Sequence, residues 1–121
     1  METLSFDIEL KEQPVELVSP DGTKKDYLLK EMDGRGRDKY MNQLQLNMVM
    51  KDGKPQGLKN YEGLYAELLT KTLFDKESGK FASKEFIQGL PARVSSKLFT
   101  AAQTLNALNE TPETEEAVKN A

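Results

Sequence analysis

The 121-residue chain contains neither cysteine nor histidine. Without cysteine, no disulfide can constrain the fold and no thiolate can act as a nucleophile or a metal ligand. Without histidine, the commonest general base and the commonest zinc ligand are both missing. We therefore expect a protein that binds other proteins, not an enzyme, and we expect no metal and no cofactor.

Long apolar runs are missing as well. No stretch approaches the roughly eighteen uncharged apolar residues that a membrane-spanning helix needs. The segment from Met1 to Asp7 carries acidic residues where a signal peptide carries basic ones. We expect no membrane partner, and we expect the protein to stay in the cytoplasm in which it is made.

A one-sided basic surface is the third absence. The chain has 20 acidic and 17 basic residues. The whole excess of negative charge lies in residues 109–121, where four glutamates stand against Lys119. The body of the chain is balanced, which argues against nucleic-acid binding. Because the tail is acidic, contains a proline and has no aromatic residue, we predict that it is flexible.

The first third of the sequence predicts strands. Apolar and polar residues alternate over residues 4–10, the period expected of a half-buried strand. Residues 15–18 predict a second strand and residues 24–29 a third, with Tyr27 and Leu29 on one face. The turn residues of the segment 19–23 lie between these last two strands. Together they predict a small antiparallel meander.

Helical signals fill the remainder. Asp33 can cap a helix that we expect to run to about Met50, and Asn60 can cap another that runs to about Phe74. Ser83 can cap a short helix, and Pro91 can begin a final one. The final helix carries an apolar stripe at helical spacing: Val94, Leu98, Ala101, Ala102, Leu105 and Leu108. The prediction is a single α+β domain over residues 1–108, with the sheet packed on three to four helices, followed by the tail 109–121.

The helix expected over residues 33–50 carries apolar residues on two sides. Tyr40, Leu44 and Met48 share one side of a helical wheel, while the other side holds Leu46, Val49 and Met50. Methionine suits adaptable contact surfaces because its side chain is flexible and polarisable. One interpretation makes Leu46, Val49 and Met50 a partner-binding face. The other is a central helix that is covered on both sides by the rest of the fold.

Two charged segments suggest ligands. Residues 75–85 offer oxygen side chains and a glycine, as an EF-hand calcium loop does, but the glycine and the final glutamate each come one place early. We expect an ordinary connection instead, with Gly79 at the bend. The basic run 35–39 has no interleaved aromatics and is diluted by acids, so we expect a solvated first helical turn.

The order of several short patterns resembles the tail assembly chaperones of long-tailed phages and prophages. They are the helix and glycine-containing loop of residues 68–81, the Leu90-Pro91 step, Leu98-Phe99, and Leu105-Asn106; the segment 32–40 fits the earlier half of that family. The resemblance covers roughly residues 15–108. It consists of weak patterns whose order and spacing give it weight.

This resemblance implies a protein of the host cytoplasm that binds the phage tape-measure protein. It would keep that apolar protein soluble while the tail tube assembles, and it would be absent from the finished particle. It also implies a homo-oligomer, and a longer form made by frameshifting through which the tail tube protein could be bound. The alternative is a minor structural tail or connector protein of the particle.

Overall fold

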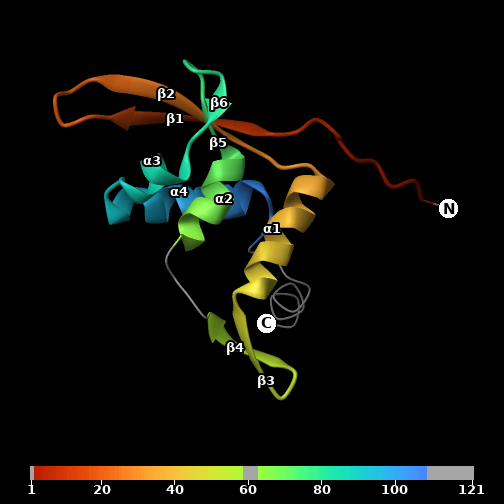
Figure 1. Ribbon diagram of the computed structural model, residues 1–121. Helices are drawn as coiled ribbons and strands as arrows, with labels where there is room; N and C mark the ends of the chain where they lie inside the picture. Colours follow the sequence, from red (N-terminus) through yellow and green to blue (C-terminus); the bar gives the residue numbers. More distant parts are fainter. Residues whose placement is uncertain (1, 59–62, 109–121) are drawn as a thin grey trace, which may run out of the picture.

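The computed structural model describes residues 2–58 and 63–108, in which a small antiparallel sheet packs against helices (Figure 1). The strands are β1 (Glu12–Val18), β2 (Lys24–Lys30), β3 (Met48–Lys51), β4 (Lys54–Leu58), β5 (Leu73–Asp75) and β6 (Lys80–Phe81). The helices are α1 (Gly34–Leu46), α2 (Leu64–Thr72), α3 (Lys84–Gln88) and α4 (Ala92–Leu105). The fold is α+β, as the sequence predicts.

The main sheet has the strand order β1-β2-β5-β6, and all its pairings are antiparallel. Tyr27 and Leu29 of β2 are both buried, which confirms that they share the face turned toward the helices. Val15 and Leu17 of β1 pack against the same core. The sheet therefore has one apolar face, the usual arrangement in a small antiparallel sheet.

Residues 4–10 do not form the expected first strand. Their apolar side chains are exposed, and Figure 1 shows the segment leaving the sheet as an extended arm. The partner of β2 on its second side is β5, with Leu29 opposite Leu73 and Tyr27 opposite Asp75. The sheet is thus completed by a strand that follows two helices in the chain, not by the N-terminal segment.

Local capping chemistry sets the starts of two helices as predicted. The Asp33 carboxylate accepts a hydrogen bond from the Gly36 N–H at 2.8 Å, and the Ser83 hydroxyl accepts one from the Phe86 N–H at 3.1 Å. Each satisfies a donor that the first helical turn would otherwise leave free. Asn60, the third expected cap, lies outside the described residues, as does the tail 109–121.

Both long predicted helices end earlier than expected. The first ends at Leu46 instead of Met50, and the second at Thr72 instead of Phe74. In each case the helical pattern runs into a strand. Leu73 becomes a strand residue because pairing with β2 satisfies its backbone and buries its side chain completely.

One hydrophobic core joins the main sheet to the helices. Its completely buried side chains include Leu29 from β2, Leu68 and Leu69 from α2, and Ile87 from α3. The predicted stripe of the last helix faces this core, with Leu98 and Ala102 buried and its other members partly buried. Within residues 2–58 and 63–108, no helix has the length and apolarity needed to cross a membrane.

A buried asparagine ties the end of α4 to the start of α1. The Asn106 side-chain oxygen accepts a hydrogen bond from the Met32 N–H at 2.6 Å, and its amide donates to the Ala102 carbonyl at 2.9 Å. Asn106 is 8% exposed. This carboxamide therefore fixes where the chain leaves β2 and enters α1.

Candidate partner-binding surface

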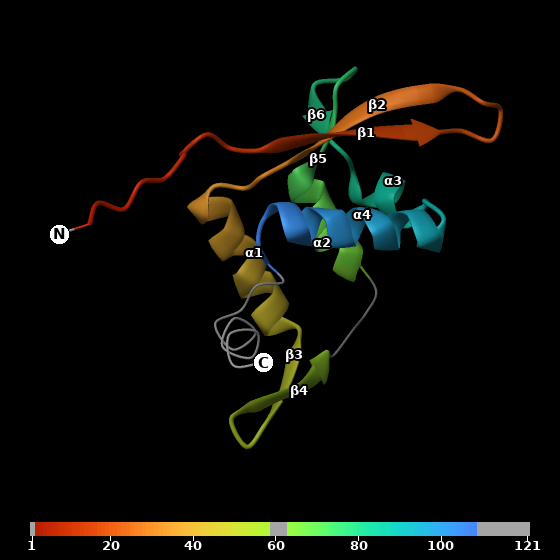
Figure 2. The ribbon, with the colours of Figure 1, turned by 180° about the vertical axis from the view of Figure 1, so that it is seen from behind.

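The second, two-stranded sheet stands apart from the main fold. β3 and β4 form an antiparallel hairpin that projects beyond the end of α1 (Figures 1 and 2). Only Met48 and Leu58, at its base, are partly buried, and its other residues are exposed. A two-stranded hairpin without further packing is at best marginally stable in water. This hairpin therefore gains stability from any partner that covers it.

The turn of the hairpin explains why the chain reverses here. Asp52 has a φ of 54° and Gly53 a φ of 75°. Two positive φ values in a two-residue loop are typical of a type I′ turn, for which Asp-Gly is a favoured sequence. The helical pattern expected to about Met50 concealed this local signal, since an Asp-Gly pair predicts a hairpin wherever short strands flank it.

Cross-strand pairing divides the hairpin into two faces. Met48 lies opposite Leu58, and Met50 lies opposite Pro55, so these four apolar residues share one face. Val49 lies opposite Gly57, and Lys51 lies opposite Lys54, on the other face. The hairpin is thus amphipathic, with four apolar side chains on one side and two lysines with Val49 on the other.

The predicted partner-binding residues, Leu46, Val49 and Met50, do not form one face of a helix, as the helical wheel predicted. Leu46 is the last residue of α1 and is 72% exposed, whereas Val49 and Met50 lie on β3 and point to opposite faces. The helical wheel was wrong beyond Leu46 because strand residues alternate in direction. The alternative of a helix covered on both sides is also wrong, since Leu46 is open to solvent. All three residues are exposed and near one another in the chain.

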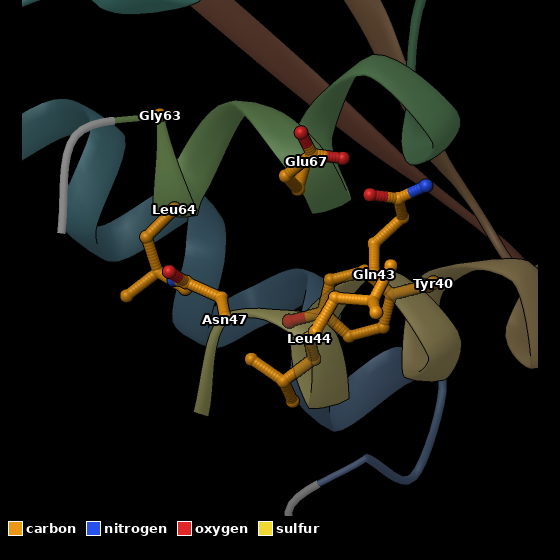
Figure 3. Close-up of a pocket in the computed structure, with 8 residues that line it drawn as sticks. Tyr40, Gln43, Leu44, Asn47, Gly63, Leu64 and Glu67 are labelled. Carbon is orange, nitrogen blue, oxygen red and sulfur yellow. The ribbon is translucent and has the colours of Figure 1, made fainter. Parts of the chain in front are cut away.

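A hollow adjoins Leu46 between α1 and α2. It has a volume of about 230 Å³, and its walls include Tyr40, Leu44 and Leu64, as Figure 3 shows. Gln43, Asn47 and Glu67 add polar groups to the wall. Burial, together with the nearby Glu67 carboxylate, raises the pKa of the Tyr40 hydroxyl above its ordinary value. The hollow extends the apolar surface of Leu46 into the body of the protein.

The two other segments that suggested ligands have structural roles. The Asp75 carboxylate accepts a hydrogen bond from the Glu77 N–H at 2.9 Å and pairs with the Lys25 ammonium at 2.9 Å. Gly79 has a φ of 72° at the bend, as expected. In the part of the chain that the structure describes, no three metal-ligating side chains cluster. The basic run 35–39 lies on the exposed first turn of α1.

The N-terminal arm, residues 2–10, supplies a second exposed apolar surface. Its residues 4–10 were expected to form a strand of the main sheet. Leu4, Phe6 and Ile8 are 80%, 77% and 93% exposed.

Comparison of the chain with known protein families, with curated proteins and with solved structures finds no match.

Proposed function

We propose that this protein is a phage tail assembly chaperone that binds the tape-measure protein in the host cytoplasm. In this role it keeps the tape-measure protein soluble during tail tube assembly and is not a component of the virion. The observation that carries the proposal is the amphipathic β3–β4 hairpin, whose apolar face is open to solvent at Met50 and Pro55.

The hairpin suits a client with a long apolar surface. Two methionines give its apolar face flexible side chains that adapt to different contacts. Leu46, at the end of α1 that precedes the hairpin, adds an exposed apolar side chain beside a hollow. A client that covers the hairpin removes apolar area from water, at roughly 25 cal/mol per Å². The same contact stabilises a sheet that is marginal alone.

The choice of client comes from the family resemblance. The patterns that carry it include Leu90-Pro91 and Leu105-Asn106, within a region of roughly residues 15–108. In that family the client is the tape-measure protein, the protein is a homo-oligomer, and a frameshifted extension can engage the tail tube protein. The acidic segment 109–121 is where such an extension would join this chain.

Co-expression with a tape-measure protein tests the proposal. The protein should raise the soluble fraction of the tape-measure protein and should co-purify with it. A variant with Leu46→Glu and Met50→Glu should lose both effects. Val18→Glu, at a site that is 58% exposed on the β1–β2 hairpin, is the matched control and should behave like the unchanged protein. If the unchanged protein gives no complex and no gain in solubility, the proposal fails.

The second candidate is a minor structural tail or connector protein. The exposed N-terminal arm favours it, because permanent subunits often use such segments to join neighbours in a particle. Mass spectrometry of purified particles separates the two functions. A chaperone should be absent from the particle, whereas a structural subunit should be present in a fixed ratio to the tail tube protein.

A further inference from the structure

The N-terminal arm has the pattern of a strand but no sheet partner among the described residues. Its apolar residues fall at every second position, with polar residues between them: Leu4, Phe6, Ile8 and Leu10. Lys11 marks where pairing with the main sheet begins, because its carbonyl accepts a hydrogen bond from the Glu31 N–H at 2.9 Å. A segment with this period buries its apolar face only when it joins a sheet.

The free edge of β1 is a poor acceptor for the arm. Lys11 turns its carbonyl toward β2, so the alternate residues Glu12, Pro14 and Glu16 turn their backbone groups outward. Pro14 has no N–H to offer an added strand, and proline on a free edge is a common protection against strand addition. The two glutamates would also repel the acidic arm.

Among the other described strands, β3 offers the best edge. β6 has only two residues. β4 contains Pro55, and its register with β3 shifts so that Gln56 has no direct partner. β3 has four residues and no proline, and each of its residues has a direct partner on β4. Among the described residues its outer edge is unpaired, because the two-stranded sheet contains only β3 and β4 there.

The arm and the hairpin also match in charge. Opposite its apolar side the arm carries Asp7, which pairs with the Lys11 ammonium at 2.9 Å, and Glu9. Lys51 and Lys54 lie directly opposite each other on the hairpin, where two like charges are unfavourable. Among the residues that the structure describes, neither lysine forms an ion pair. An acidic strand beside β3 would relieve this repulsion.

In one arrangement, the apolar and the charged faces of the arm coincide with those of the hairpin. When Leu4, Phe6 and Ile8 lie on the side of Met48 and Met50, Asp7 and Glu9 lie on the side of the lysines. Cross-strand apolar pairs and opposite charges then both favour the pairing. In the two views of the fold, the arm leaves the molecule at the main sheet and the hairpin lies at the other end (Figures 1 and 2).

We infer that the arm of one copy of this chain adds as a third strand to β3 of a second copy. The partner surface is thus a strand edge, and its occupant is residues 4–10 of another protomer. The added strand widens the apolar face of the hairpin by three side chains. The inference goes beyond the proposed function, because it names the contact between copies and does not depend on the client.

Disulfide trapping tests the contact, since the chain has no cysteine of its own. A Ser5→Cys protein and a Val49→Cys protein, distinguished by size tags, are mixed and oxidised. A disulfide forms only when the two Cα atoms come within about 7 Å. The mixed dimer should predominate, and it should be about tenfold less abundant when Val18→Cys replaces Val49→Cys, since diffusion alone links the control pair.

Charge reversal provides an independent readout. Asp7→Lys with Glu9→Lys should weaken self-association about tenfold, measured by analytical ultracentrifugation. Adding Lys51→Glu and Lys54→Glu to the same chain should restore it. Equal mixed-dimer yields for Val49→Cys and Val18→Cys, or no rescue by the second pair, would overturn the inference. Client co-purification is measured separately, so either failure leaves the proposed function standing.

Discussion

Met50 and Pro55 lie directly opposite each other in the β3–β4 hairpin, and both side chains are exposed. Together with the half-buried pair at the base of the hairpin, they form an apolar face without a cover. Apolar residues on a marginal two-stranded sheet contribute little to the stability of the main fold, which makes this face a candidate for contact with another molecule.

The first prediction concerns stability without a client. Leu46→Glu with Met50→Glu should change the free energy of unfolding by no more than about 0.5 kcal/mol, because both residues are exposed. Urea unfolding followed by circular dichroism measures this value. A loss of several kcal/mol would mean instead that these residues belong to the core.

The second prediction concerns the hairpin turn. Gly53 has a φ of 75°, and a β-carbon at this position would meet no atom within 4 Å. Gly53→Ala should therefore destabilise the hairpin through backbone strain alone, by about 1–2 kcal/mol. Amide exchange of β3 and β4 should become faster while that of β2 and α2 stays unchanged. Faster exchange throughout the chain would show that the hairpin and the main fold unfold together.

The third prediction concerns Asn106. Asn106→Ala removes the acceptor of the Met32 N–H and should cost about 1–3 kcal/mol, since a partly buried donor loses its partner. Asn42→Ala, at an exposed position of α1, is the control and should change stability little. Chemical denaturation of the two variants compares the costs. Equal small effects would show that water replaces the asparagine.

The fourth prediction concerns acid. The Lys25 ammonium, followed by backbone N–H groups, holds the pKa of the Asp75 carboxyl below its usual 3.8. The folded state thus releases this proton more readily than the unfolded state. The resulting stabilisation is complete well above pH 4 and is lost as the pH falls through the lowered pKa.

Asp75→Asn should therefore be less stable than the unchanged protein at pH 7, and the difference should shrink at pH 3. Lys25→Met should show the same convergence, because it removes the other partner of the 2.9 Å contact. Urea unfolding at both pH values measures the two differences. A difference that stays constant with pH would contradict the assigned pair.

Local chemistry made much of the main fold predictable. Asp33 and Ser83 cap helices as expected because capping depends on a few neighbouring residues. The faces of β2 and α4 followed from their periods. These features do not depend on where distant parts of the chain lie.

The features of the fold that differ from the prediction depend on contacts between distant segments or on the Asp52-Gly53 turn. Leu73 continues a helical period, but pairing with Leu29 makes it a strand residue. Residues 4–10 have a strand period, yet they pair with no strand among the described residues. Of the three predicted partner-binding residues, Leu46 lies on the expected helix, whereas Val49 and Met50 lie on β3, because the Asp52-Gly53 turn forms a hairpin.

The most direct test of the account is co-purification of a tape-measure protein with three forms of this chain. The unchanged protein and Val18→Glu should each recover the client in a soluble complex, and Leu46→Glu with Met50→Glu should recover at least about tenfold less. Equal recovery by all three forms would contradict the assignment of the hairpin surface. No recovery by the unchanged protein would contradict the chaperone function itself.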